Sequence, residues 1–169
     1  MPTNPWFPPA NDTLTDGELT LLPWSRVKTV PGVRDDLFAA SVDPRMVEWT
    51  TVPSPYTVEM AEAFLGDAGD GCVRWALVVD DRYCGSIELR PDDSGGADFG
   101  YNTAPWARGR GLMTRAVRLV TDHAFAEGAP LLIIRALPDN AASRHVAEVN
   151  GFVFAGERDE HVEYVKHAE

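Results

Sequence analysis

The chain has 169 residues, a mass of 18.5 kDa and a formal net charge of -11 at pH 7. This length suits one domain with a full hydrophobic core and is short for two. Hydrophobic residues make up 44% and charged residues 24%, which excludes disordered, collagen-like and disulfide-scaffold classes. The acidic balance argues against a nucleic-acid partner and allows a cationic substrate, although it also suits a generic acidic surface.

The first 16 residues contain four prolines, which cannot donate backbone hydrogen bonds to a sheet. We therefore predict a proline-rich arm over residues 1–16, fastened to the surface by Trp6 and Phe7, and a single domain over residues 17–169. This N-terminus has neither the basic end nor the apolar segment of a signal peptide, and no apolar run approaches the roughly 18 residues of a membrane span. We expect a cytoplasmic protein without a membrane partner.

Hydrophobic periodicity predicts the elements of the N-terminal half. Residues 17–24 read as a strand, and residues 33–43 and 57–65 as helices, the second capped by Thr57 with Met60 and Leu65 facing inward. Alternating apolar residues then predict three strands joined by turn-rich segments, which make an antiparallel meander. These strands cover residues 74–79, 83–90 and 97–103. Cys72 and Cys84 lack metal-ligand spacing, so we expect free thiols and no metal site.

The C-terminal half reads as a helix over 111–128, a buried parallel strand over 131–137, a helix over 140–150 and a closing hairpin over 152–165. The first of these helices should bury one broad apolar stripe, formed by Leu112, Met113, Ala116, Val117, Leu119, Val120 and Ala124. A strand, helix, strand unit of this kind implies a crossover within a mixed sheet. The pattern therefore predicts an α/β fold, and ligands favour the carboxyl ends of its parallel strands.

The loop ARGRGLM, residues 107–113, lies between a predicted strand and a predicted helix. The segment from Phe99 to Thr121 contains no acidic residue, although the chain is acidic and four arginines fall there. A helix N-terminus exposes backbone amides and attracts anions, and glycines let a phosphate approach them. The glycine spacing fits neither nucleoside triphosphate nor dinucleotide motifs. The loop therefore predicts a site for another phosphate-bearing ligand.

Two segments, GYNTAPWARGRGLMTRAV and LPDNAASRHVAEVNGFVFAGE, resemble the cofactor motifs of the GNAT superfamily of N-acetyltransferases, especially its ribosomal-protein (RimJ/RimL-like) branch. The first fits R/Q-x-x-G-x-G/A through Arg108 and Gly111, and the second fits N-x-x-S through Asn140 and Ser143. The resemblance extends over about residues 17–166. It implies a mixed, mostly antiparallel central sheet flanked by helices, with two strands splayed at an acyl-CoA site.

The resemblance implies that acetyl-CoA is the cofactor and that coenzyme A is released. Its pyrophosphate would lie on the backbone amides of Arg108, Gly109, Arg110, Gly111, Leu112, Met113 and Thr114. Asn102 and Thr103 would bond the pantetheine through their main chain, as an added strand does. Asn140 and Ser143 would lie beside the pantetheine and sulfur, and Asn140 also fits a helix cap.

Two departures from the family pattern affect these expectations. Met113 stands where the family usually has Gly or Ala, so close backbone approach would depend on Gly109 and Gly111. Ala147 occupies the place of a tyrosine that many members use as the general acid. Ser143 or a water is then the candidate proton donor for the thiolate.

Acyl transfer to an amine needs a neutral amine, a stabilised oxyanion and a proton for the departing thiolate. Glu88 and Asp98 are the candidate bases, and Asp98 falls where several family members keep a catalytic glutamate. If these two residues pair directly across the hairpin, repulsion would raise the pKa of one carboxyl. A slip of one residue would abolish the arrangement, and solvent-facing strand positions are the alternative for both.

Trp49, Pro53 and Tyr56 fall where the family folds a loop that faces the acceptor, with core packing as the alternative. The resulting hypothesis is direct acetyl transfer to a primary amine. The first acceptor class is a protein or peptide N-terminal α-amine. A small cationic amine, such as a polyamine or aminoglycoside, is the second acceptor class. A non-catalytic acyl-CoA sensor is a rival, and a homodimer is compatible with the closing hairpin.

Overall fold

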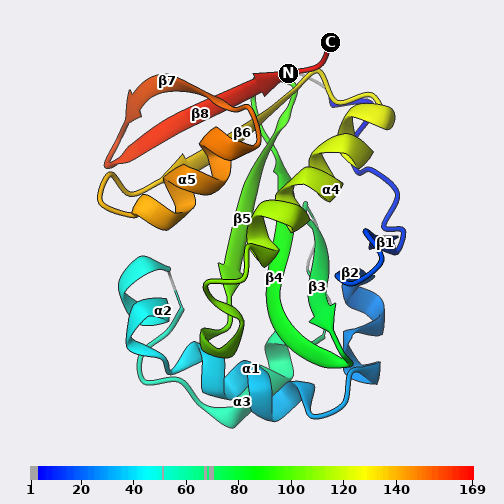
Figure 1. The fold of residues 1–169 in the computed structure, drawn as a ribbon, viewed down its shortest axis with the longest axis vertical. Helices are drawn as coiled ribbons and strands as arrows, with labels where there is room; N and C mark the ends of the chain where they lie inside the picture. Colours follow the sequence, from blue (N-terminus) through cyan, green and yellow to red (C-terminus); the bar gives the residue numbers. More distant parts are fainter. Residues whose placement is uncertain (1–3, 51, 67, 69–70) are drawn as a thin grey trace.

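The computed structural model describes residues 4–50, 52–66, 68 and 71–169 (Figure 1). Its strands are β1 Leu14–Thr15, β2 Thr20–Pro23, β3 Val73–Val79, β4 Arg82–Pro91, β5 Ala97–Thr103, β6 Leu131–Ala136, β7 Val153–Arg158 and β8 His161–His167. Its helices are α1 Val33–Ser41, α2 Pro44–Trp49, α3 Val58–Phe64, α4 Leu112–Ala126 and α5 Ala141–Val149, with 3-10 turns η1 Trp24–Thr29 and η2 Pro105–Ala107.

The strands form a sheet in the order β1-β2-β3-β4-β5-β6-β8-β7. Every neighbouring pair is antiparallel except β5 and β6, which run parallel. The predicted mixed, mostly antiparallel sheet is therefore confirmed, as is the meander of β3, β4 and β5. No helix in the described ranges has the length and apolar character needed to cross a bilayer.

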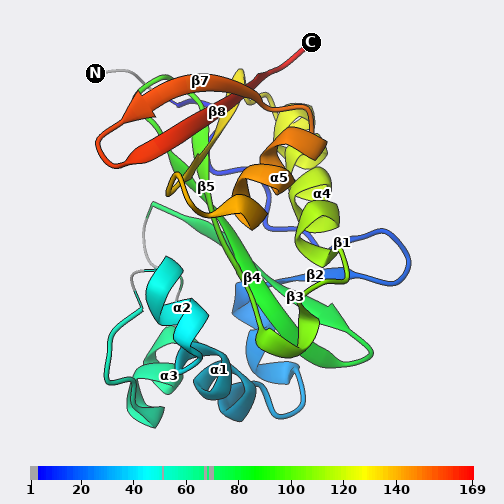
Figure 2. The same ribbon diagram turned by 60° about the vertical axis from the view of Figure 1, so that its left-hand side comes forward.

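Helices lie on both sides of this sheet (Figure 2). Trp75 and Leu77 of β3 belong to the hydrophobic cluster that contains α4, whereas Ala76 belongs to a second cluster with α1 and α3. Successive strand residues point to opposite faces, so a strand covered on both faces is apolar throughout. This explains why β3 reads as a nearly continuous apolar run.

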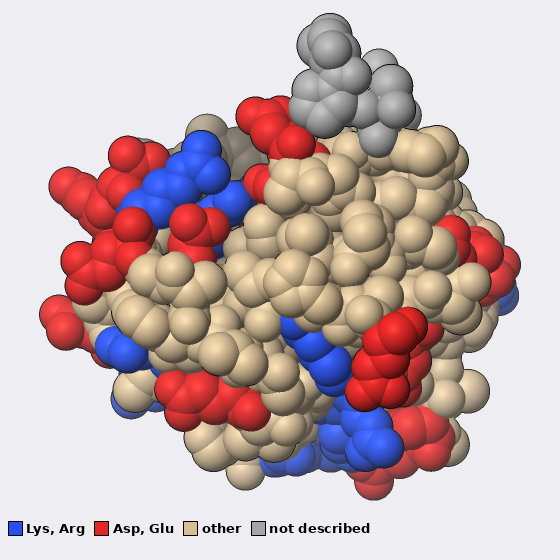
Figure 3. Space-filling model, turned by 90° about the horizontal axis from the view of Figure 1, so that it is seen from above, with Lys and Arg blue, Asp and Glu red and all other residues tan. Residues whose placement is uncertain are grey.

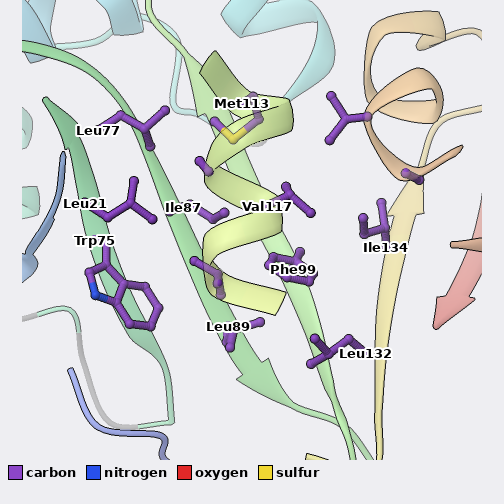
Figure 4. Packing of buried hydrophobic residues seen from close by; sticks show 14 of the residues in the cluster. Leu21, Trp75, Leu77, Ile87, Leu89, Phe99, Met113, Val117, Leu132 and Ile134 are labelled. Atoms are coloured by element: carbon purple, nitrogen blue, oxygen red, sulfur yellow. The ribbon is translucent and has the colours of Figure 1, made fainter. Parts of the chain in front are cut away.

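Helix α4 packs its apolar stripe onto the centre of the sheet (Figure 4). Met113 and Val117 lie over the strands, close to Ile87 of β4 and Phe99 of β5. Each fully buried aliphatic side chain contributes about 1.5–3 kcal/mol, so this stripe fixes the helix position. The predicted stripe is confirmed except at Leu119, which is only partly buried.

The structure differs from the sequence prediction at several elements. Met60 was expected to face inward but is 39% exposed, because the inward face of α3 runs through Ala61 and Leu65, which are four residues apart and buried. Helix α2 was not predicted, although Asp43 and Pro44 supply the typical cap and first residue of a helix. The predicted arm also contains a strand, since Leu14 pairs with Leu21 of β2.

The N-terminal arm is fastened to the rest of the chain at several points. Trp6 donates its indole N–H to the Gly95 carbonyl at 2.8 Å, which confirms the predicted anchoring role of Trp6. Further along, Arg115 of α4 binds Asp16 through Nε at 2.6 Å and Nη2 at 2.7 Å. This hydrogen bonding lowers the pKa of Asp16 to about 2. Residues 1–3 lie outside the described part of the arm.

Strands β5 and β6 separate toward their carboxyl ends, as the family resemblance implied. Their parallel pairing covers Ala97 to Phe99 of β5 against Leu132 to Ile134 of β6. Strand β5 continues to Thr103 beside β4, while β6 continues to Ala136 beside β8. The edge of β5 that faces β6 therefore has no strand partner after Phe99 within the described residues.

Gly85 of β4 lies opposite Thr103, at the end of β5 that has separated from β6, and there the two strands approach closely. Its φ is +150°, and an added Cβ would collide with the Asn102 carbonyl oxygen of β5. We expect Gly85→Ala to lower the free energy of unfolding by about 1–3 kcal/mol, the usual cost of overpacking. Urea denaturation measures this loss.

Gly17→Ala is the matched control, because φ is +107° and an added Cβ meets no atom within 4 Å. It carries backbone strain without the collision, so we expect a smaller loss. Equal losses in the two variants would contradict the steric explanation.

Candidate active site

A cavity of about 510 Å³ opens where β5 leaves β6. Its walls come from α2, from the end of β5, from the loop before α4 and from the first turns of α4 and α5. This volume lies within the range of roughly 300–1,000 Å³ that is typical of small-molecule sites. Of the predicted site residues, its lining includes Trp49, Asn102, Thr103, Arg108, Gly109, Gly111, Leu112, Met113, Thr114, Asn140 and Ser143.

The loop before α4 presents bare backbone to this cavity. Gly109 and Gly111 have φ values of +74° and +70°, a region that favours glycine. A Cβ at either position would meet no atom within 4 Å, so the left-handed backbone rather than crowding requires glycine there. Gly111 is the N-cap of α4 and supplies no side-chain cap. The first amides of α4 therefore suit an anionic ligand.

Arg108 connects this loop to α2. Its Nη2 lies 2.8 Å from Oδ2 of Asp43, and the two side chains are 29% and 19% exposed. The same Asp43 oxygen caps α2 by accepting the backbone N–H groups of Arg45 and Met46. The Arg108 guanidinium holds the pKa of Asp43 below its usual value. Arg110, which was also predicted, is exposed and is not part of the cavity lining.

The end of β5 forms the floor of the cavity. Asn102 turns its side-chain amide to Ser86 of β4, with Nδ2 3.1 Å from Oγ. Tyr101, which the sequence analysis did not single out, lines the cavity with its phenol 2.9 Å from the Ser143 hydroxyl. Strand alternation could have indicated it, because Tyr101 shares the face of buried Phe99. Burial raises the pKa of Tyr101 to about 12.

Helix α5 forms the wall opposite α2. Asn140 caps α5, since its Oδ1 accepts the Ser143 backbone N–H at 3.2 Å. Ala147 is fully buried in the core cluster, so no side chain from that position reaches the cavity. Met113 is buried as well, at 6% exposure, and lies at the cavity wall.

The register that would pair Glu88 directly with Asp98, which the sequence left open, does not occur. Glu88 lies opposite Gly100, and Asp98 lies opposite Arg90, because the turn occupies residues 92–96 and Pro91 pairs with Ala97. A shift of two residues keeps both carboxylates on one face but separates them along the strands. Neither belongs to the cavity lining.

Each of these carboxylates instead has an arginine partner. Glu88 accepts from Arg74 at 3.1 Å, and Asp98 lies 3.0 Å from Arg90 and 3.3 Å from Arg135. Burial raises the pKa of Asp98 above its usual value, and the two neighbouring guanidinium groups partly oppose this rise. The cause of the shift is therefore desolvation, rather than the repulsion by Glu88 that the sequence suggested.

The predicted acceptor residues occupy different places. Trp49 lines the cavity, whereas Pro53 is exposed, and Tyr56 packs toward Phe38 with ring centroids 6.2 Å apart. Other lining residues of α2 and α5 were not predicted as site residues. They include Arg45, Met46, Thr50 and His145. Arg45 and Met46 were missed because α2 itself was not predicted.

Comparison with known proteins identifies the family. Residues 21–153 match the family model described as an acetyltransferase (GNAT) domain. The chain therefore belongs to the GNAT acetyltransferase family and is an N-acetyltransferase. A comparison with curated proteins gives no match.

Solved structures confirm the fold. A RimL ribosomal L7/L12 α-N-protein acetyltransferase with coenzyme A has a TM-score of 0.76 and 17% identity, covering 92% of this chain and 98% of its own. The microcin C7 self-immunity acetyltransferase MccE, in complex with acetyl-CoA and AMP, has a TM-score of 0.75 and 16% identity; the match covers 90% of this chain and 93% of MccE. Mycobacterium smegmatis RimJ, in complex with a CoA-disulfide, has a TM-score of 0.71 and 18% identity; the match covers 94% of this chain and 88% of RimJ. Identities this low support the fold alone.

The link between Asp43 and Arg108 can be measured with a double-mutant cycle. We expect Asp43→Ala and Arg108→Ala to show a coupling energy of about 0.5–1 kcal/mol near neutral pH. Because the folded state lowers the Asp43 pKa, this coupling is present above the unfolded pKa of about 3.9 and is lost as the pH falls through the folded pKa. Urea denaturation of the four proteins measures it.

The exposed pair Arg34–Glu62 provides the comparison, since its side chains are 55% and 54% exposed. We expect a smaller coupling there because solvent screens it. A coupling at Asp43–Arg108 no larger than at this exposed pair would contradict a structural role for the link.

Proposed function

We propose that this protein transfers the acetyl group of acetyl-CoA directly to a primary amine. The observation that carries the proposal is the cavity at the open edge of β5, beside the uncapped N-terminus of α4. A glycine loop with positive φ, free helix amides and an unpaired strand edge suit the diphosphate and the amide-containing arm of coenzyme A. When bound, acetyl-CoA supplies the reactive thioester.

The proposed binding roles follow the order of these elements along the cavity. Backbone amides of residues 108–114 hold the pyrophosphate, and the charge of Arg108 supports them. The free edge of Asn102 and Thr103 holds the pantetheine by main-chain hydrogen bonds. Asn140 caps α5. In this proposal Asn140 and Ser143 lie beside the pantetheine and the sulfur, and Ser143 is the proton donor for the thiolate.

For the general base, we place Glu88 ahead of Asp98. Glu88 lies opposite Gly100, the first residue of β5 beyond the pairing with β6, and Asp98 lies within the paired region. If Gly100 carried a Cβ, that atom would lie 3.2 Å from Glu88 Cγ. Because glycine has no side chain, the Glu88 side chain can lie against the backbone of Gly100, the residue before Tyr101. Asp98 is engaged by two arginines, whereas Glu88 is engaged by one, Arg74.

For the acceptor, we propose a protein or peptide N-terminal α-amine in the cytoplasm, as in the RimJ/RimL-like branch. Such an amine has a pKa of about 7.7–8.0 and is partly neutral near pH 7, so a modest base suffices. The RimL structure, described as an L7/L12 α-N-protein acetyltransferase, has a similar fold. Trp49 lines the proposed acceptor end, and Pro53 and Tyr56 lie on the segment that follows.

A small cationic amine is the second candidate, because the net charge of -11 favours a cationic acceptor. Calorimetry with acetyl-CoA, followed by thiol release with peptides, polyamines and aminoglycosides, separates the candidates. Release with peptides alone supports the first and release with small amines the second. Binding without turnover across all amines would instead identify an acyl-CoA sensor.

A homodimer through β7 is also part of this proposal. Strand β7 is at the end of the sheet, and its Val153 and Phe154 are 69% and 52% exposed. The end of the molecule that is turned upward in Figure 1 presents a broad area of neutral side chains with charged groups toward its margins (Figure 3). We also propose residues 1–16 as an arm and 17–169 as the catalytic domain.

Thr114 provides a charge test of the proposed phosphate site. It lines the cavity from the first turn of α4, where a glutamate favours the helix. We expect Thr114→Glu to weaken acetyl-CoA binding at least about tenfold by charge repulsion. Calorimetric titration measures the change.

Thr114→Gln is the isosteric control without charge and should retain most of the affinity. If both variants lose affinity equally, size rather than charge is responsible. Unchanged affinity in Thr114→Glu would refute the placement of the pyrophosphate.

The assignment of the base predicts two different pH-rate profiles. A base acts only when deprotonated, so the rate should fall as pH drops through its pKa. We expect Glu88→Gln to lower kcat about 100-fold and to abolish this acidic limb, and Asp98→Asn to retain it. Thiol release across a pH series measures both profiles. If only Asp98→Asn abolished the fall in rate at low pH, Asp98 rather than Glu88 would be the general base.

A further inference from the structure

Two hydroxyl groups meet on the cavity wall, and the roles described above use only one of them. Tyr101 Oη lies 2.9 Å from Ser143 Oγ and 3.2 Å from the Ser143 carbonyl oxygen. Both residues line the cavity, and they come from different elements, β5 and α5. The phenol therefore links β5 to α5 at the cavity wall.

We propose that Tyr101 is the positioning residue that makes Ser143 a proton donor toward the thioester sulfur. This inference rests on the proposed function of the cavity. A seryl hydroxyl carries a single proton, which points either to Tyr101 or into the cavity. When Tyr101 donates to Ser143 Oγ, the seryl proton is free to point into the cavity. In the other arrangement, the phenol donates its hydrogen to the Ser143 carbonyl oxygen and the seryl proton points to Tyr101.

The proton transfers balance within this pair and water. As the tetrahedral intermediate collapses, the C–S bond breaks and its electron pair stays on sulfur. The Ser143 proton moves to sulfur while the Tyr101 proton moves to Ser143 Oγ. Water then returns a proton to the phenolate, and the acceptor nitrogen releases one proton to the base and solvent, so no net proton is consumed.

The surroundings of the phenol suit this role. Burial raises its pKa to about 12, so the phenol keeps its proton at physiological pH and remains a donor. Ser143 lies in the first turn of α5, where the helix dipole favours negative charge on a nearby sulfur. Ala147 of α5 is fully buried and has no polar side chain, so within this helix the hydroxyl that faces Tyr101 is that of Ser143.

Tyr164 shows what a structural tyrosine looks like in the same region. Its hydroxyl accepts from Arg144 at 3.0 Å and donates to Glu148 at 3.1 Å, so it also ties a strand to α5. Tyr164 does not line the cavity. It is therefore a matched control for loss of a hydroxyl that contacts this helix.

The test measures the thiol pKa of bound coenzyme A from thiolate absorbance near 232 nm across a pH series, with desulfo-coenzyme A as the blank. It needs no acceptor amine. The other ionisable side chains that line the cavity are those of Arg45, Arg108, Asp139 and His145. All variants retain them, so their influence on the thiol is constant. Calorimetry with coenzyme A first establishes binding for each protein.

We expect Tyr101→Phe to raise the bound thiol pKa by about one unit, because the thiolate loses an oriented donor. Ser143→Ala should give a rise of similar size, and the double variant no further rise. Tyr164→Phe should leave the midpoint unchanged. With any active acceptor, Tyr101→Phe should lower kcat at least tenfold and leave KM within about twofold.

Different failures have different meanings. If wild-type protein does not bind coenzyme A, the proposed function fails and the role of Tyr101 fails with it. If all variants bind and Tyr101→Phe keeps the wild-type thiol midpoint, the role of Tyr101 alone is overturned. If Tyr101→Phe does not fold, an unchanged midpoint in Ser143→Ala overturns the proposal in the same way.

Discussion

The short parallel pairing between β5 and β6 is the constraint on which the site depends. It ends at Phe99 and Ile134, although both strands continue. Beyond that point each strand is held by its outer neighbour, β5 by β4 and β6 by β8. The sheet therefore opens while keeping its other hydrogen bonds. The opening exposes a backbone edge that a ligand with amide groups can pair with.

The core directs two helix N-termini at this opening. Helix α4 is fixed by its apolar stripe over Ile87 and Phe99, and its uncapped N-terminus begins at the cavity (Figure 4). Helix α5 begins on the other side with Asn140 as its cap. Positive φ at Gly109 and Gly111 lets the loop turn into α4 with its backbone bare. Packing, rather than local propensity, brings these features together.

Ion pairs organise the surroundings of the cavity in this acidic chain. Asp43 caps α2 and binds Arg108, so the wall that carries Trp49 is connected to the anion loop. On β4 and β5, Glu88 and Asp98 are each held by arginines. The arginine-rich segment that stood out in the sequence is thus partly neutralised by carboxylates distant in the chain, as Arg115 is by Asp16.

From β2 onward and apart from α2, the sequence by itself determined the order of the main strands and helices, as well as the mixed sheet, the apolar stripe of α4 and the glycine loop. Periodicity and turn chemistry are local properties, which is why the sequence carries them. Tertiary structure decided the register that separates Glu88 from Asp98, since a strand pattern of period two permits shifts by two residues. It also decided that Tyr101 meets Ser143 and that α2 closes the cavity. These contacts join residues far apart in the chain, and only the packing of the sheet and helices sets their distances.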